Sequence, residues 1–319
     1  MEKTLKEQWF LISLAFLFIA VIFDSSNMLA TVGIFLKNHH GPEFMIFMIF
    51  FISGLMIEND QVKAGVKDIK STVLALILIL VAAPLAALGL SVFPMETGVL
   101  AGLFIVASMP TTLSSGVVMT GMAGGNMAHA LFVTILSNFI GIFSIPLILS
   151  SLMSSLHYDQ QLVIDQRAII IKLFILVVCP LLTGMAVKNY LLKKKNTDLS
   201  GLQIINQFLV IGVVFISLAG AKDVLLRRGG IFFQVVLLAA GFHLLLLTSS
   251  FVLIKLSGIE KGRRESVIFM GSQKTLPLSV MIQVTYFSEF GTALLVLVVH
   301  HVLHLMIDGY LSTRMGKRN

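Results

Sequence analysis

The sequence is poor in cysteine and in charge. Cys179 is the single cysteine among 319 residues, which excludes an intramolecular disulfide framework and a Cys/His metal set. Charged residues make up only 12% of the chain, compared with about a quarter of a typical soluble domain. A soluble globular protein is therefore excluded as well.

Apolar residues take the place of the missing charge. They account for 57% of the chain, and the mean hydropathy is +0.96. They fall in runs of about 20 residues, in which a helix satisfies its own backbone hydrogen bonds within lipid. The sequence therefore predicts an all-α integral membrane protein with ten transmembrane helices. The expected spans are 9–24, 42–57, 71–93, 97–121, 127–153, 167–188, 202–220, 230–257, 264–286 and 290–312.

The basic residues are distributed unevenly between the two sides of these spans. Of the 23 Lys and Arg residues, 16 fall on the side of the N-terminus, 6 fall on the other side, and Lys274 lies within a span. This bias predicts that both termini are cytoplasmic, in an inner or plasma membrane. It also accounts for the net charge of +7 without a nucleic-acid partner. We expect membrane lipid and a small solute as partners, and the sequence indicates no oligomeric state.

The chain divides into two halves of five spans each. The polar segment 154–166 is the expected linker between a first half, 1–153, and a second half, 167–319. Since five is odd, the two halves have opposite orientations, as in the inverted repeats of many secondary transporters. A shift of 164 residues supports the repeat because it superimposes identical residues. The pairs are Ser53 and Ser217, Ser108 and Ser272, Thr111 and Thr275, and Ser115 and Ser279.

Two polar stretches interrupt the fourth and ninth spans. Residues 108–116 and 271–279 each combine hydroxyl side chains with a proline, Pro110 or Pro277. A proline inside a helix costs about 3 kcal/mol or more, and in lipid such a break persists only where protein or a wet cavity surrounds it. An ordinary kink would explain one such span. Two at equivalent positions predict crossed, discontinuous helices with a binding site at the midplane, and hence a transporter.

Lys274 lies in the middle of the ninth span. A lysine at the bilayer centre costs at least about 2.5 to 3.5 kcal/mol, so we expect it to face the bundle interior and to have a partner. Three roles are open. It is a fixed cation that binds free backbone carbonyls, a ligand of an anionic substrate, or a proton carrier.

Further polar side chains occur in the fifth and tenth spans. Thr134 and Asn138 share a helical face and would either supply oxygens to an ion or bond to neighbouring helices. His300, His304 and Asp308 also share a face, at intervals of four residues. That face is either a metal or proton-relay site or a polar stripe packed against the broken helices. A metal is disfavoured because no glutamate base lies between the two histidines.

Several of these motifs resemble one family. The run 110–118, the pair Gly125-Asn126, the triplet 136–138 and the segment 271–276 resemble signatures of the bile acid:sodium symporter superfamily, and within it of the SBF-like branch. The resemblance implies a panel domain of spans 1, 2, 6 and 7 and a core domain of spans 3, 4, 5, 8, 9 and 10. It further implies that spans 4 and 9 cross, with an organic anion in front of the crossing and, in the sodium-coupled branch, two sodium ions behind it.

The chain departs from the sodium-coupled pattern at the ion site. Phe269 replaces a glutamate of that branch and Lys274 replaces an asparagine, whereas Gln273 is kept. A glutamine and a serine of that branch are replaced by Ile79 and Ala130. Losing a carboxylate and gaining an ammonium disfavours bound sodium by several kcal/mol. We therefore expect Lys274 to replace sodium, so that coupling is by proton through Lys274 or is absent.

These observations predict a secondary active transporter of an organic anion, either bile-acid-like or a small carboxylate, that works by alternating access. We expect no enzyme activity, no metal site and no resident cofactor, and sodium is possible only without the two-site binding of the symporters. One alternative is a metal-dependent enzyme that uses His300, His304 and Asp308, and another is a regulator of the same fold that moves no solute. His300 and His301 are candidates because the resemblance aligns them with a His-Asn pair near the substrate. The expected substrate- or ion-binding residues are Pro110, Thr111, Thr112, Ser114, Ser115, Thr134, Asn138, Gln273, Lys274, Thr275, His300 and His301.

Overall fold

The computed structural model describes residues 2–57, 65–112, 114–156, 164–192, 200–227 and 230–317. Within these ranges every regular element is a helix and none is a strand, which confirms the all-α class. Residues 157–163 of the predicted linker lie outside the described residues.

Helices fill both halves of the chain. In the first half they are α1 (Glu2–Phe23), α2 (Met28–Asn38), α3 (Gly41–Met56), α5 (Ile69–Ile77), η1 (Leu78–Ala82), α6 (Ala83–Leu90), α7 (Thr97–Ser108), α8 (Ser115–Met122) and α9 (Met127–Met153). In the second half they are α10 (Gln166–Leu173), η2 (Phe174–Val178), α11 (Cys179–Val187), η3 (Lys188–Leu192), α12 (Ser200–Arg227), α13 (Ile231–Ser257), α14 (Arg264–Ser272), α15 (Leu276–Tyr286) and α16 (Gly291–Gly316). The segments η1, η2 and η3 are short π-helical turns that continue the neighbouring α-helices.

Six helical stretches of the described chain are long and apolar enough to cross a membrane. They are Ile69–Leu90, Met127–Met153, Gln166–Tyr190, Gly201–Gly220, Ile231–Ser257 and Gly291–Gly316. These stretches support the multi-pass membrane class. The predicted fourth and ninth spans do not appear among them, because each is divided into two shorter helices. The total of ten spans and their inverted repeat stay predictions.

The sequence did not indicate α2, which lies in the expected connection between the first two spans. α1 and α2 meet at an angle of 109°. The turn between them is stabilised by Asp24, whose Oδ2 accepts a hydrogen bond from the backbone N–H of Leu29 at 2.8 Å. Lys222 of α12 donates to the main-chain carbonyl of Asp24. The bend is therefore held against α12.

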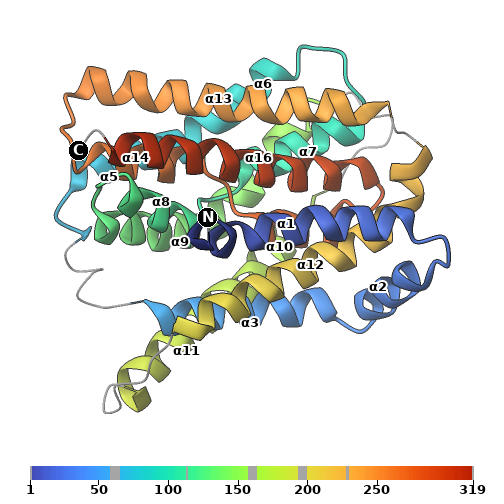
Figure 1. Ribbon diagram of the computed structural model, residues 1–319. Coiled ribbons are helices and arrows are strands. Elements are labelled where there is room, and N and C mark those ends of the chain that lie inside the picture. Colours follow the sequence, from blue (N-terminus) through green and yellow to red (C-terminus); the bar gives the residue numbers. More distant parts are fainter. Residues whose placement is uncertain are drawn as a thin grey trace.

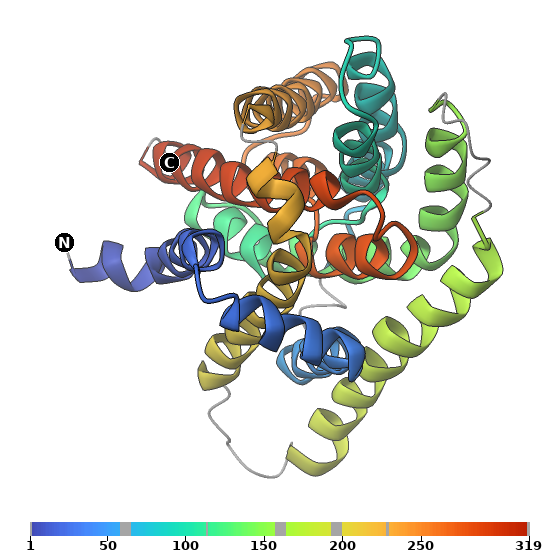
Figure 2. The same ribbon diagram turned by 90° about the vertical axis from the view of Figure 1, so that its right-hand side faces the viewer.

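The helices pack in two groups that meet where α12 contacts α15 and α16, where α3 contacts α15 and where α10 contacts α9. In one group α3 packs against α11 and α12, and α12 also contacts α1 and α2. In the other, α16 packs against α7 and α13. In Figure 1, α3, α11 and α12 lie in the lower part of the view and α13 runs along the top. Figure 2 shows the long segment of α10 and α11 along one outer edge of the molecule.

A close helix crossing in the first group is made by two glycines. A β-carbon on Gly54 of α3 would lie 2.2 Å from the carbonyl oxygen of Leu181, and one on Gly184 of α11 would lie 2.2 Å from the carbonyl oxygen of Phe51. Any larger residue at either position would force α3 and α11 apart. Small residues at such contacts are typical of helices that pack within membranes.

Both predicted helix breaks occur, and they have the same local geometry. α7 ends at Ser108 and α14 ends at Ser272, the two serines that a shift of 164 residues superimposes. Each serine Oγ donates to the carbonyl four residues earlier, that of Phe104 at 2.7 Å and that of Ile268 at 2.8 Å. The residue after each serine is extended, with ψ of 150° in the first break and 148° in the second. The chain then unwinds before α8 and α15 begin.

Candidate functional site

The two unwound segments lie against each other. The backbone N–H of Thr275 donates a hydrogen bond to the carbonyl oxygen of Pro110 at 3.0 Å, and both residues are buried. Neither proline interrupts a helix interior. Pro110 lies between α7 and α8, whereas Pro277 lies in the first turn of α15, where its missing N–H has no helical partner to lose. The prolines thus delimit the half-helices instead of kinking them.

The side chain of Lys274 lies inside this crossing and is only 1% exposed. Its Nζ donates to the carbonyl oxygens of Ile79 at 3.0 Å, Ala107 at 3.2 Å and Met109 at 2.9 Å. Ala107 and Met109 lie at the C-terminal end of α7, where carbonyls lack helical donors and the helix dipole is negative. An ammonium has three N–H groups, so main-chain oxygens use all of them.

The carbonyl of Ile79 is free because of a proline five residues later. In a regular α-helix the N–H of Ala83 would donate to Ile79, but it donates to Leu78 instead, which produces the π-helical turn η1. Pro84 has no N–H group, so it cannot donate to the Ile79 carbonyl in place of Ala83. Ile79 is therefore left without a helical donor, and Lys274 supplies one.

Gln273 connects the two breaks to the last helix. Its Oε1 accepts hydrogen bonds from Thr112 Oγ1 at 2.8 Å and from Ser115 Oγ at 2.9 Å. Its Nε2 donates to Asp308 Oδ2 at 2.8 Å. Gln273 is fully buried, so one neutral side chain links the hydroxyls of the first break to a buried carboxyl group on α16.

A histidine-rich cluster surrounds that carboxyl group. Asp308 Oδ1 lies 2.9 Å from His243 Nε2 on α13. Nδ1 of His304 lies 4.0 Å from Asp308 Oδ2, and Nε2 of His304 lies 2.9 Å from Nδ1 of His301. The ring of His300 packs 5.5 Å from the ring of Phe242, centroid to centroid. The cluster therefore joins α13 and α16 next to the crossing.

The sequence did not indicate every member of this cluster. It favours His300 and His301 as binding residues and leaves Asp308 out of the expected set, although Asp308 is the residue that contacts Gln273. It missed His243 altogether, because a single histidine in a long apolar helix carries no spacing signal. The only sequence signal for the cluster was Asp308 itself, because a carboxyl group within a membrane span requires a partner. Every intramembrane acid has this requirement, so it does not identify the partner.

Thr134 and Asn138 of α9 hold the first unwound segment from the other side. Thr134 Oγ1 lies 3.1 Å from the carbonyl oxygen of Thr112, and Asn138 Nδ2 donates to that of Thr111 at 3.4 Å. Oγ1 of Thr111 and Oδ1 of Asn138 are buried without a hydrogen-bond partner. Ser114 precedes α8 and makes no side-chain capping bond. The candidates from the two breaks and α9 therefore converge on one region.

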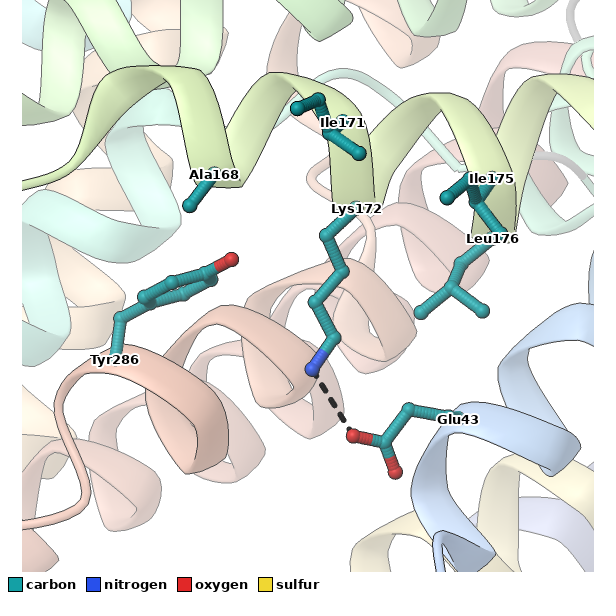
Figure 3. Close-up of a pocket in the computed structure, with 7 residues that line it drawn as sticks. All are labelled: Glu43, Ala168, Ile171, Lys172, Ile175, Leu176 and Tyr286. Carbon is teal, nitrogen blue, oxygen red and sulfur yellow. Dashed lines mark hydrogen bonds and ion pairs between the residues drawn. The ribbon is translucent and has the colours of Figure 1, made fainter.

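A cavity of about 450 Å³ lies away from the crossing, between α3, α10 and α15 (Figure 3). Within it Lys172 Nζ donates to Glu43 Oε1 at 3.0 Å and to Thr285 Oγ1 at 3.1 Å. Its lining residues are Glu43, Ala168, Ile171, Lys172, Ile175, Leu176 and Tyr286. Tyr286 is the last residue of α15, whose length of 11 residues separates the cavity from the crossing by roughly 15 Å. The cavity is therefore distinct from the polar crossing.

No metal centre is found in the part of the chain that the structure describes. Among those residues, no three His, Cys, Asp or Glu side chains are arranged to hold a metal ion. The spacing of His300 and His304 is thus not completed by a third ligand there.

A family profile matches almost the entire chain. The profile is that of the SBF-like CPA transporter family, and it matches residues 8–317. This match agrees with the family that the two polar stretches of the sequence resemble.

Named relatives agree with the profile. The chain is 34% identical to the probable sodium/metabolite cotransporter BASS4 of Arabidopsis thaliana, over 84% of this chain and 65% of the plant protein. It is 25% identical to the sodium/bile acid cotransporter 7-A of Xenopus laevis, over 97% of this chain and 92% of that protein. It is 24% identical to the sodium-dependent transporter YocS of Bacillus subtilis, over 85% of this chain and 83% of that protein. The chain thus spans slightly less than two thirds of the plant relative's length.

Proposed function

The chain belongs to the SBF-like CPA transporter family, and we propose that it moves a small organic anion across the membrane by alternating access. It is an integral membrane transporter rather than an enzyme, because its relatives are cotransporters and its helices are long and apolar. We further propose that Lys274 takes the place of the sodium ions of related symporters.

The position of the Lys274 ammonium is the observation that carries this proposal. It is held by three main-chain oxygens, two at the end of a half-helix and one at a π-helical turn. Unwound carbonyls and half-helix C-termini are the ligands that sodium has in transporters with broken helices. A protonated lysine in this environment supplies a positive charge, and a second cation nearby would be repelled. This favours the fixed-cation role over the role of substrate ligand.

The other two helix ends at the crossing favour an anionic substrate. α8 begins at Ser115 and α15 begins at Leu276, and neither N-cap residue, Ser114 or Thr275, caps its helix with its own side chain. In α8 only the N–H of Gly116 has a side-chain acceptor, Thr112 Oγ1 at 3.2 Å. The N-terminal end of a helix carries partial positive charge and free N–H donors, so it attracts a carboxylate or sulfate group. Thr111, with its unpartnered Oγ1, lies beside these ends. We propose that the anionic group of the substrate binds here.

The repeated geometry of the breaks supports a two-fold internal repeat. Ser53 and Ser217 add a third pair at the same shift of 164 residues, each donating to the carbonyl four residues earlier, at 2.7 Å and 2.9 Å. We propose that α1, α3, α11 and α12 form the panel and that the helices around α7, α14 and α16 form the core. Movement of the core against the panel would expose the crossing to each side in turn.

The proposal is tested by a binding screen on the purified full chain. Bile acids and small mono- and dicarboxylates are screened by thermal shift, with size-matched cationic and neutral solutes as controls. A ligand at about 100 times its dissociation constant stabilises the folded state by roughly 2.7 kcal/mol. Uptake of the stabilising anions into proteoliposomes is then measured. Binding or uptake of the cationic or neutral solutes alone would overturn the proposed substrate class.

A further inference from the structure

The histidine cluster beside the crossing has no role in the proposed handling of the anion. It consists of Asp308, His243, His300, His301 and His304, none of which is more than 7% exposed. The ring of His304 lies at its centre, with centroid distances of 5.8 Å to His243, 5.3 Å to His300 and 4.7 Å to His301. Four imidazoles and one carboxyl group therefore share one buried volume.

The carboxyl group of Asp308 lacks a permanent positive partner. Its two close hydrogen-bond partners are the amide of Gln273 and the imidazole of His243. The ammonium of Lys274 is directed at backbone carbonyls instead. A buried carboxylate without a cation costs several kcal/mol, so a proton on Asp308 or on an adjoining imidazole lowers the free energy of this state.

Three ring nitrogens of the cluster are candidate sites for such a proton. Nδ1 of His243, Nε2 of His300 and Nδ1 of His304 are buried and have no hydrogen-bond partner. In the tautomer whose hydrogen is on the other ring nitrogen, a proton can be added at such an unpartnered nitrogen without breaking an existing hydrogen bond. Histidine is also the side chain whose ordinary titration falls between about pH 5 and pH 8.

The contacts of the cluster lead in two directions. Toward the crossing, Gln273 joins Asp308 to the hydroxyls of the first break. Because its Oε1 is occupied by those hydroxyls, its Nε2 must donate, and Asp308 must accept on that oxygen. Toward the other helix group, the ring of His301 lies edge-on to Phe10 of α1, with centroids 6.3 Å apart. A movement of α1 relative to α16 would uncover His301 first.

We propose that Asp308 and these four histidines bind one proton, and that this proton is the ion coupled to transport. The inference rests on the proposed transport function and moves the proton-carrying role from Lys274 to the cluster. The proton enters from water at His301 and passes through His304 to Asp308. When the crossing is open to the opposite side of the membrane, the proton leaves through the ring of His301. The described titratable groups that face the cluster are its own five members and Lys274.

The experiment uses purified full chain in proteoliposomes on a solid-supported membrane, with no organic solute present. The solution is changed from about pH 8.5 to about pH 5.5, a range that covers histidine titration, and the displaced charge is recorded. We expect a transient charge displacement in the unmodified protein. The displaced charge should fall at least about tenfold in Asp308→Asn and in His304→Gln, because each variant removes a group that the proton requires.

His39→Gln is the matched control, since His39 is exposed and lies at the end of α2, outside the cluster. Its signal should equal that of the unmodified protein. Absence of a signal in the unmodified protein overturns the inference, whether or not the variants fold. A signal that persists in both folded cluster variants also overturns it. Charge displacement without uptake of any anion would contradict the proposed function alone, and pH-independent anion uptake would contradict the inference alone.

Discussion

Lys274 Nζ lies 3.0 Å from the carbonyl oxygen of Ile79, a residue 195 positions earlier in the chain. The contact joins the broken ninth segment to the π-helical turn η1, and it depends on two local features that lie far apart in the sequence. Pro84 frees the carbonyl, and the unwound segment between α14 and α15 lets the lysine reach it. A positive charge is thereby fixed among main-chain oxygens at the centre of the molecule.

Replacing Lys274 with methionine should destabilise the protein. Methionine fills a similar volume but leaves three buried carbonyls without a donor, at about 1 to 3 kcal/mol for each unsatisfied group. We expect the apparent melting temperature of Lys274→Met to fall by several degrees. Lys255→Met is the matched control, because Lys255 is exposed at the end of α13. Equal melting temperatures for the two variants would contradict the assigned role.

Pro84→Ala should also destabilise the protein, although removing a proline from a helix normally does the opposite. Alanine restores an N–H that allows η1 to return to regular α-helix, in which the Ile79 carbonyl is taken by Ala83. Lys274 then loses one of its three acceptors. The control is Pro180→Ala, since Pro180 follows the similar turn η2, which contributes no carbonyl to Lys274. A melting temperature for Pro84→Ala at or above that of Pro180→Ala would refute this explanation.

The sequence predicted the helical class and the two breaks because both leave strong local signals. Long apolar runs require helices, and a proline with hydroxyls inside such a run requires a break. It did not predict α2, whose bend depends on the long-range contact of Lys222 with Asp24. It did not identify His243 or the Ile79 carbonyl either. Main-chain groups have no sequence signature, and contacts between distant helices are decided by packing.

Gln273 should couple the protonation of Asp308 to the hydroxyl groups of the first break. Gln273→Leu removes the acceptor for Thr112 and Ser115 as well as the donor to Asp308. We expect loss of anion uptake. Gln273→Glu should keep the acceptor but bring a second carboxyl group within hydrogen-bond distance of Asp308, where two like charges repel. Anion uptake by Gln273→Glu should therefore recover only at acidic pH, where the pair can share a proton. A pH-independent loss of uptake would contradict this link.

An ion pair outside the membrane-spanning segments predicts a pH-dependent contribution to stability. Burial raises the pKa of Asp68, but hydrogen bonds from Arg263 and Ser71 outweigh it and hold that pKa well below its ordinary value of 3.8. A lowered pKa means that the stabilisation is present above 3.8 and is lost as the pH falls toward the folded-state pKa.

The matched variant is Asp68→Asn, which keeps a good helix cap for α5 and removes the charge. Because Arg263 is half exposed, the pair contributes at most about 1 kcal/mol. The unmodified protein should melt about 2 °C higher than the variant near neutral pH. This difference should shrink below about pH 4, and a difference that grows on acidification would contradict the assignment.

The most direct test of the central claim is anion uptake into proteoliposomes in sodium chloride and in N-methyl-D-glucamine chloride, at the same pH and ionic strength. If Lys274 replaces sodium, the unmodified protein should transport equally well in both, to within about twofold, less than 0.5 kcal/mol. Lys274→Asn should lose uptake without sodium and regain part of it when sodium is added. A dependence on sodium of about tenfold or more in the unmodified protein, equivalent to 1.4 kcal/mol, would contradict the account.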